Sequence, residues 1–384
     1  MLSIQPRLLT LGPLALTAEI KASMQSDLGS RDMTFRQITH DIRTWIQEVA
    51  GAGPEYSVVP VQGSGTFAIE GVLTTFIKDT DKVLVCANGI YGETAAKILQ
   101  RHMIQHKVLS WPITQVVDVA EVDATLDANA DITHLYFVHC ETTSGIGNPM
   151  PDLLALARRR GVVSIVDAMS SFGALEIDAR VHPFDILIAS GNKCLEAPPG
   201  IAFAIVSRAL LTPQTTVIRT YTLDLYDQWR QFEETGEWRC TPPTHVAQAL
   251  RTALADLRQE TVAGRRARYT AVRDRFIAGL EPLGIRPILP ASVQTPICVA
   301  FRCDALVPDA DAFATYYRHL RDAGLLIYAR FHQQSRSFRI GCIGRIEPEW
   351  IDDLIEATWR FARLNSRPDA MLVRRQSHVA EQLA

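Results

Sequence analysis

Short apolar runs alternate with longer amphipathic stretches between about Ser57 and Ser207, and this alternation restricts the fold more than any other feature of the chain. Buried parallel strands read as continuous runs of Val, Ile and Leu, and a crossover helix usually joins two of them. The pattern therefore predicts an α/β fold with a mostly parallel sheet flanked by helices. The runs expected to form the strands are YSVVPV, KVLVCAN, THLYFVHCE, VVSIVDA, DILIAS and IAFAIVS.

A different pattern follows the predicted sheet. Pro242 and Pro243 precede one long helical segment that continues to about Leu283, since proline suits a helix start. From Pro287 the order becomes strand, helix, strand, strand and helix, which is typical of a smaller α+β domain. We therefore expect an N-terminal arm at residues 1–15, a large domain at 16–280, a small C-terminal domain at 281–365 and a flexible tail at 366–384.

Composition and charge exclude several classes of function. The 384 residues are 47% hydrophobic and 21% charged, a balance typical of a globular protein and not of a disordered one. Lys and Arg number 39 against 42 Asp and Glu, so the net charge of -3 creates no field that would hold a nucleic acid. Pro6, Arg7 and Pro13 interrupt the N-terminal residues before a signal peptide or membrane span could form, which favours a cytoplasmic protein without membrane contact.

The seven cysteines are scattered and never spaced as C-x-x-C. This spacing indicates neither a disulfide framework nor a structural zinc site, and we expect no metal. Cys194 has no histidine near it in the sequence that would make it a nucleophile, so we expect it to be a packing residue.

Polar residues follow three of the predicted strands, at the edge where a doubly wound sheet places its ligand. The stretch Gln62-Gly63-Ser64-Gly65-Thr66 precedes an amphipathic helix whose free N–H groups suit a phosphate. Asp167 ends one strand, where a buried carboxylate needs a cationic or donor partner, and Lys193 follows another in a loop of small residues. Each feature alone has an ordinary alternative, namely a turn, a helix N-cap or salt bridge, and a solvated surface lysine.

Together these three features match what pyridoxal 5'-phosphate requires: a lysine for a Schiff base, an acid for the pyridine nitrogen and donors for the phosphate. The chain resembles the class V aminotransferases of fold type I, and among them most closely the 2-aminoethylphosphonate:pyruvate transaminases. The matching stretches occur in the family's order from the arm to the small domain, and they are LLTLGPLALT, VQGSGTFAIEGVL, ANGIYG, HCETTSGIGNP, IVDAMSSFGA, SGNKC, TLDLYDQW, GEWRCTPPTHV and FRIGCIG.

The resemblance implies a role in cofactor binding for the residues at the three strand ends. Lys193 would form the Schiff base, and Asp167 would pair with the pyridinium nitrogen. Ser64, Gly65 and Thr66 would hold the phosphate through backbone and hydroxyl donors. The N-terminal arm would pack with the small domain.

Further roles follow from the same resemblance, and each has a structural alternative. Tyr91 would stack on the cofactor ring, or be a core aromatic residue after a turn. Thr143 and Ser190 would donate hydrogen bonds to cofactor oxygens, or cap local backbone groups. Thr241 would reach the phosphate of the neighbouring subunit, so the active sites would need a homodimer. Arg339 would bind a substrate carboxylate through a bidentate pair, or pair with a structural carboxylate.

The implied reaction moves the amino group of 2-aminoethylphosphonate to pyruvate and yields phosphonoacetaldehyde and alanine. An alanine:glyoxylate or serine:pyruvate aminotransferase shares the cofactor residues and is the alternative; a cofactor-binding protein without catalysis is another. The chain departs from the subgroup's pattern at residues 29–32, at Leu11 and in the segment IYARFHQQSRS, which border the substrate in this family. Further basic candidates for a phosphonate contact are Arg31, Arg239, Arg330 and His332.

Overall fold

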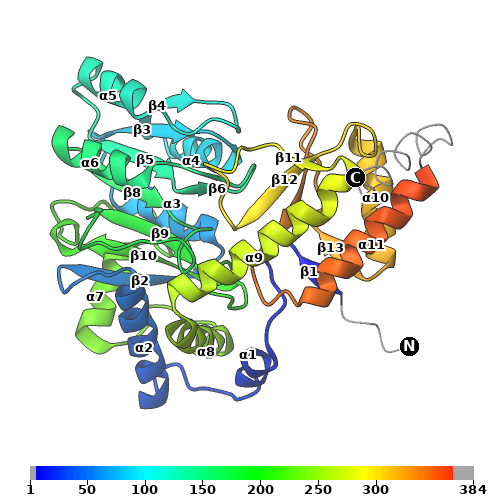
Figure 1. Cartoon of the computed structure of the whole chain (residues 1–384). Helices are drawn as coiled ribbons and strands as arrows, with labels where there is room; N and C mark the ends of the chain where they lie inside the picture. The colour runs from blue at the N-terminus through cyan, green and yellow to red at the C-terminus, as the bar shows by residue number, and fades with distance from the viewer. Residues whose placement is uncertain (1–5, 366–384) are drawn as a thin grey trace.

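The computed structural model describes residues 6–365, which form two units joined by a long helix (Figure 1). The predicted tail at 366–384 lies outside the described residues. The larger unit is built on a seven-stranded sheet with the order β2-β10-β9-β8-β5-β3-β4. Its strands are β2 (Tyr56–Gly63), β3 (Lys82–Ala87), β4 (Gln105–Ser110), β5 (His134–Val138), β8 (Val163–Asp167), β9 (Ile186–Ser190) and β10 (Gly200–Ser207).

The sheet is mostly parallel, as the apolar runs predicted. Strands β9, β8, β5, β3 and β4 pair in parallel, whereas β10 is antiparallel to both β9 and β2. The expectation that IAFAIVS is a parallel strand is therefore wrong. The loop at 191–199 that joins β9 to β10 is too short for a parallel crossover, which takes about a dozen residues or more. The apolar pattern did not predict strand β4, because QHKVLS is an edge strand with few buried side chains.

Helices cover both faces of this sheet. On one face lie α3 (Gly65–Thr75) and α4 (Ile90–Arg101). On the other lie α1 (Ala18–Ser23), α2 (Met33–Val49), α5 (Val119–Ala128), α6 (Met150–Arg160) and α8 (Thr244–Glu260), while α7 (Leu225–Thr235) packs beside β2. Side chains alternate between the two faces, so Tyr136 packs with the first group and Phe137 with the second. Because both faces are buried, the strands read as unbroken apolar runs.

The second unit contains a three-stranded antiparallel sheet of β11 (Arg286–Pro287), β12 (Cys298–Arg302) and β14 (Phe338–Gly341). Helices α10 (Ala310–Asp322) and α11 (Pro348–Asn365) pack against it. Strand β1 (Arg7–Leu9), near the start of the chain, pairs in parallel with β13 (Leu325–Ile327), so the N-terminal segment lies against the C-terminal unit (Figure 1).

Helix α9 (Val262–Leu280) spans the two units, and its residues Val272, Phe276 and Leu280 belong to the core of the C-terminal one. The prediction of one continuous helix up to about Leu283 is wrong, because α8 ends at Glu260 and α9 begins after Thr261. Thr261 has φ +69°, a left-handed conformation that interrupts the helix, and its hydroxyl accepts a hydrogen bond from the N–H of Gly264.

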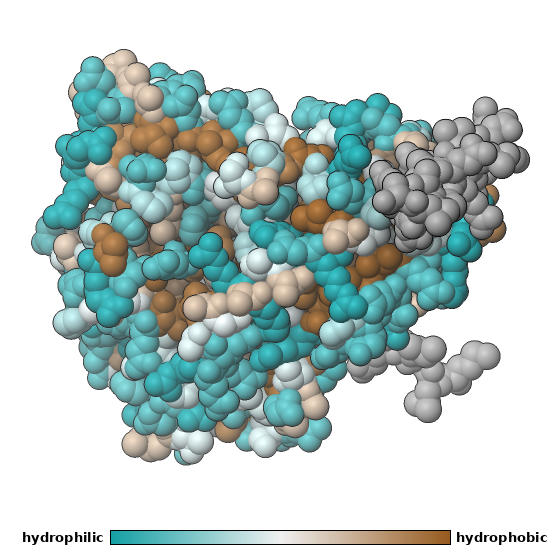
Figure 2. All heavy atoms as spheres, viewed as in Figure 1, coloured by the Kyte–Doolittle hydropathy of each residue, from teal (hydrophilic) through white to brown (hydrophobic). Residues whose placement is uncertain are grey.

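Hydrophilic residues form most of the face seen in Figure 2, and hydrophobic residues show between them in patches. Among residues 6–365, no helix combines the length and the apolarity that a membrane span requires. Cys86, Cys140, Cys194, Cys298, Cys303 and Cys342 are buried free thiols, whereas the free thiol Cys240 is partly exposed.

Candidate active site

Lys193 lies in the loop between β9 and β10, and its Nζ donates a hydrogen bond to the carbonyl oxygen of Leu11 at 2.5 Å. Burial lowers the pKa of Lys193; among the charged groups around it, Arg339 lowers the pKa further and Asp167 raises it. A lowered pKa increases the share of neutral amine, the form that attacks carbonyl carbon and accepts protons. Lys193 is therefore equipped for nucleophilic and proton-transfer chemistry.

Gly12 permits this approach of the N-terminal segment to Lys193. Its φ of +114° is unfavourable for other residues, and an added Cβ would lie 2.9 Å from the carbonyl oxygen of Asn192 and 3.1 Å from Cδ of Lys193. The segment at Leu11, where the chain departs from the subgroup pattern, thus contacts Lys193 directly.

Asp167 ends β8 and is 1% exposed. Its Oδ1 accepts a hydrogen bond from the N–H of Met169 at 2.9 Å, and its Oδ2 accepts one from the hydroxyl of Tyr136 at 3.0 Å. Burial raises the pKa of Asp167 to about 6, although both hydrogen bonds and the charge of Lys193 act in the opposite direction. A buried acid held by neutral donors is suited to receive a cationic partner. Tyr136 was not identified from the sequence, in which it reads as one more apolar strand residue.

The predicted phosphate site lies at the start of α3. Ser64 is the N-cap residue, but its hydroxyl makes no capping hydrogen bond, and the first turn of the helix carries no acidic residue. An added Cβ on Gly65 would lie 2.4 Å from Sδ of Met169, so only glycine lets this helix end approach the segment after Asp167. Ser64 and Thr66 are exposed. The structure thus brings an open helix N-terminus next to the buried acid, an arrangement that suits an anion.

Arg339 lies in β14 and is 4% exposed. Its Nη1 donates to the carbonyl oxygen of Thr142 at 2.7 Å, and its guanidinium carbon lies 4.0 Å from the centre of the Tyr328 ring. Within residues 6–365 no carboxylate lies at ion-pair distance from Arg339, which argues against the alternative of a structural salt bridge. A buried guanidinium without a counter-ion is costly, so the site favours an anionic ligand.

Tyr91 begins α4 beside the hairpin of β6 (Cys140–Glu141) and β7 (Ile146–Gly147). Its N–H donates to Oε2 of Glu141 at 3.2 Å. Burial raises the pKa of Tyr91. The ring is half-buried and lies near Tyr328 and Arg339, so Tyr91 belongs to the same site as the unpaired guanidinium.

Thr143 has protein partners on both sides of its hydroxyl. Its Oγ1 donates to Oε1 of Glu141 at 2.6 Å and accepts from the N–H of Ile90 at 3.1 Å. The Oγ1 of the neighbouring Thr142, which the sequence did not single out, is buried and has no hydrogen-bond partner among residues 6–365, so the Thr142 hydroxyl is free to bind a ligand. No sequence signal distinguishes two adjacent threonines in a tight hairpin.

The remaining candidates lie in different surroundings. Ser190 ends β9, is 3% exposed, and its Oγ is buried without a hydrogen-bond partner in the described part of the chain. Thr241 is exposed in the loop before α8. Cys194, next to Lys193, is fully buried, and burial raises the pKa of its thiol to about 12, as expected of a packing residue.

The basic candidates for a phosphonate contact differ in their ion pairs, their exposure and their nearness to Arg339. Arg239 pairs with Asp227 at 2.8 Å, and the exposed Arg31 lies 3.7 Å from a carboxylate oxygen of Glu237. Arg330 is exposed, whereas His332 is half-buried and near enough to Arg339 for that charge to contribute to its lowered pKa, of which burial is the main cause. His332 is thus the member of this set that shares the surroundings of Arg339.

Comparison with known proteins agrees with this geometry. The sequence signature described as Aminotransferase class-V matches residues 15–313. The chain belongs to this family.

Class V relatives include curated proteins named 2-aminoethylphosphonate--pyruvate transaminase. The one from Burkholderia thailandensis is 41% identical over 342 residues, which cover 89% of this chain and 92% of the relative. The one from Pseudomonas fluorescens is 37% identical over 359 residues, covering 93% and 97%. A solved alanine--glyoxylate aminotransferase from Nostoc sp. has the same fold, with a TM-score of 0.84, 23% identity, and coverage of 94% of this chain and 96% of that one. These findings confirm the predicted class V family and fold type I architecture.

Proposed function

We propose that the protein binds pyridoxal 5'-phosphate and transfers the amino group of 2-aminoethylphosphonate to pyruvate, giving phosphonoacetaldehyde and alanine. The observation that carries this proposal is the buried guanidinium of Arg339, unpaired among the described residues, near the desolvated amine of Lys193. The names of the curated relatives supply the donor and the acceptor.

The residues at the strand ends fit the cofactor. Asp167 is a buried acid that has only neutral hydrogen-bond donors, and a pyridinium nitrogen would provide the missing cation. The Oγ of Ser190 is buried and has no hydrogen-bond partner within residues 6–365, so it can donate to a cofactor oxygen. Ser64, Gly65 and Thr66 form an open helix N-terminus for the phosphate.

Tyr91 would pack its ring on the cofactor ring, since it is half-buried beside Thr142 and Arg339. Thr143 would donate to a cofactor oxygen only by giving up its bond to Glu141, because its hydroxyl carries one proton. We retain Thr143 in the proposed set on the family resemblance, and we add Thr142 on the geometry.

The bound cofactor supplies an electron-withdrawing ring that acidifies the carbon bearing the amine. Lys193 Nζ would accept the proton from that carbon and deliver it to the cofactor carbon, a role for which its lowered pKa is suited. Asp167 keeps the ring nitrogen protonated, and Arg339 holds the anionic end of the donor or of pyruvate through its forked donors. In the structure this amine is oriented by its hydrogen bond to the carbonyl oxygen of Leu11.

We also propose a homodimer, in which Thr241 reaches the phosphate held by the other subunit. Thr241 is exposed and so is free to make such a contact. Large hydrophobic side chains near the phosphate site and in the segment before α7 are exposed, and a second subunit would cover them; they are Phe67, Ile218 and Tyr221. The large domain at 16–280 would bind the cofactor, and the small one at 281–365 would carry Arg339.

An absorption spectrum tests this proposal. The purified protein should show a cofactor band that bleaches when 2-aminoethylphosphonate is added without keto acid, and the band should return with pyruvate. A band that bleaches with alanine or serine but not with 2-aminoethylphosphonate would favour the alanine:glyoxylate or serine:pyruvate alternative. Lys193→Ala should abolish the bleaching, and an active Lys193→Ala protein would contradict the assignment of Lys193.

A further inference from the structure

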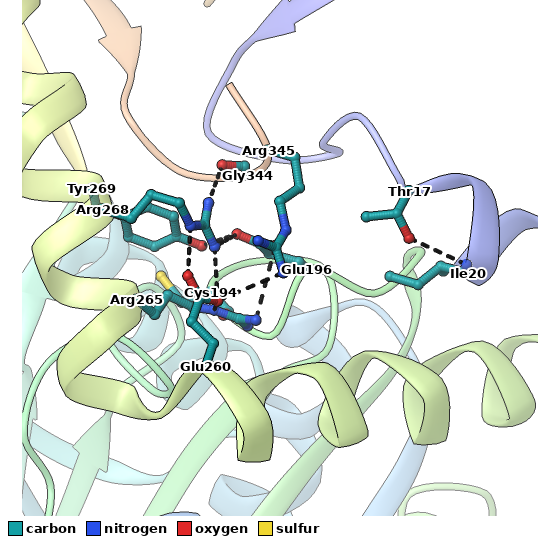
Figure 3. Close-up of polar contacts among 10 residues, drawn as sticks. All are labelled: Thr17, Ile20, Cys194, Glu196, Glu260, Arg265, Arg268, Tyr269, Gly344 and Arg345. Atoms are coloured by element: carbon teal, nitrogen blue, oxygen red, sulfur yellow. Dashed lines mark hydrogen bonds and ion pairs between the residues drawn. The ribbon is translucent and has the colours of Figure 1, made fainter. Parts of the chain in front are cut away.

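A buried charged cluster joins the two units of the fold (Figure 3). Two carboxylates and three guanidinium groups form this Glu196 cluster, whose members are Glu196, Glu260, Arg265, Arg268 and Arg345. Glu196 lies in the loop of Lys193, Arg265 and Arg268 lie on α9, and Arg345 follows the strand β14. The cluster thus connects the loop of the reactive amine with the segment that follows Arg339.

Glu196 holds the turn that contains Lys193. Its N–H donates to the carbonyl oxygen of Lys193 at 2.9 Å, and its φ of +60° is a conformation that residues other than glycine rarely adopt. The carboxylate is 3% exposed and its Oε1 accepts from Nη2 of Arg268 at 2.8 Å and from the hydroxyl of Tyr269 at 2.5 Å. Arg265 adds a second anchor, because its Nη1 donates to the carbonyl oxygen of Cys194 at 2.8 Å.

The same cluster holds the segment after β14. Nη1 of Arg268 donates to the carbonyl oxygen of Gly344 at 2.6 Å, so one guanidinium binds both Glu196 and the segment that continues from Arg339. Nε of Arg345 lies 3.3 Å from Oε2 of Glu196. Figure 3 shows Arg268 and Arg345 approaching Glu196 from opposite sides.

Stability alone does not account for this arrangement. Burying charged groups costs desolvation energy that their attraction often fails to recover, so buried ion pairs are weak evidence of a stabilising role. Moreover, Nη2 of Arg265 is buried without a hydrogen-bond partner among residues 6–365, which is a further cost, and the contact of Arg345 Nε with Glu196 is an ion pair that lacks hydrogen-bond geometry. Residues in unfavourable backbone conformations, such as Glu196, gather at functional sites.

We propose that Glu196 is a positioning residue, which together with Arg268 and Arg345 sets the position of Lys193 relative to Arg339. This inference rests on the transamination proposed above. Lys193 moves the proton while Arg339 holds the anionic end of the substrate, and the two residues belong to different units of the fold. Misplacement of reacting groups by about 1 Å can reduce a rate by roughly 100-fold.

The variants Glu196→Gln and Arg345→Gln test this role. Arg251→Gln is the matched control, because Arg251 has a similar side-chain exposure, 38% against 35%, and pairs with Asp41 at the contact of α8 with α2. The readouts are the single-turnover rate of cofactor-band bleaching, the apparent Kd of the amine, the isotope effect with amine deuterated at the reacting carbon, and the Tm.

We expect both test variants to lower the single-turnover rate about 10- to 100-fold and to raise the isotope effect, because proton transfer becomes slower. The apparent Kd should change by less than about threefold, since the contacts of Arg339 with the anion remain, and Arg345→Lys should recover part of the rate. The control should keep the wild-type rate whatever its Tm. Test variants that lose Tm but keep their rate within about twofold of wild type would overturn the proposal.

Failure of this inference can be distinguished from failure of the proposed donor. If the wild-type band bleaches with alanine and not with 2-aminoethylphosphonate, the proposed donor is wrong, and the same comparison made with alanine decides the role of Glu196. If Glu196→Gln does not fold, Arg345→Gln decides, because its side chain is partly exposed and its loss leaves the bonds of Arg268 intact. If neither amine bleaches the wild-type band, both proposals fall.

Discussion

Replacing Asp167 with Asn should change how the stability of the cofactor-free protein depends on pH. Burial raises the pKa of Asp167 from 3.8 to about 6 in the folded state. A shift of about two units corresponds to about 3 kcal/mol, at about 1.4 kcal/mol per unit. Because the folded-state pKa is the higher one, this stabilisation is fully present below about pH 3.8 and is lost as the pH rises through about 6. Asn carries no charge and removes this dependence.

Urea unfolding of both cofactor-free proteins at pH 4.5, 6 and 7.5 measures the effect. The difference between the two unfolding free energies isolates Asp167 from the other titrating groups. We expect Asp167→Asn to gain about 2 kcal/mol relative to wild type between pH 4.5 and 7.5, since part of the total is already lost at pH 4.5. The amide can keep both contacts, because its oxygen accepts from Met169 and the Tyr136 hydroxyl can turn to accept from its NH₂ group.

Without cofactor at pH 7.5 we expect Asp167→Asn to be more stable than wild type. Adding pyridoxal 5'-phosphate at that pH should make wild type the more stable of the two. A ligand that binds only the folded state stabilises it according to its affinity, and the wild-type carboxylate can pair with the pyridinium nitrogen whereas Asn cannot. A difference in unfolding free energy that stays constant from pH 4.5 to 7.5 would refute the argument from burial. An equal gain of both proteins from the cofactor would refute the proposed pairing.

Three further substitutions probe the site. Arg339→Lys should raise the KM for pyruvate about 10- to 100-fold, since losing a charged hydrogen bond costs about 1.5–3 kcal/mol, and an unchanged KM in steady-state assays would exclude the anion-binding role. Tyr136→Phe removes a donor to Asp167 and should raise the carboxyl pKa above about 6, which a ¹³C NMR titration would show as a shifted midpoint. Gly65→Ala would place Cβ 2.4 Å from Sδ of Met169 and should lower both the Tm and the cofactor affinity. Recovery in a double variant with Met169→Ala would identify that contact as the cause. A Tm of Gly65→Ala equal to that of wild type would contradict it.

The sequence by itself determined the α/β architecture and the chemical type of the site. Strands buried on both faces must be continuously apolar, so six of the seven strands of the large sheet were visible as apolar runs, and only the edge strand β4 was not. Asp167 lies at the end of one such run and Lys193 lies just beyond another. The carboxyl ends of parallel strands meet at one edge of the sheet. Proximity of these two groups therefore followed from local pattern and a general rule of topology.

The tertiary structure decided what depends on contacts between distant segments. Strand β10 runs antiparallel because a short loop precedes it, and Thr261 divides a helix through its backbone conformation. Among residues 6–365 no carboxylate lies at ion-pair distance from Arg339, and Lys193 donates a hydrogen bond to Leu11; both facts depend on which distant segments meet in the fold.

Glu196 is the clearest example of a residue whose contacts the sequence pattern does not predict. In the sequence it is one acidic residue in a loop, yet the fold surrounds it with Arg268 and Tyr269 of helix α9 and with Arg345 of the segment after β14. Periodicity and turn signals report which face of an element is buried, but not which side chains of other elements meet there. Pairing of buried charges depends on that meeting, and so only packing in three dimensions determines it.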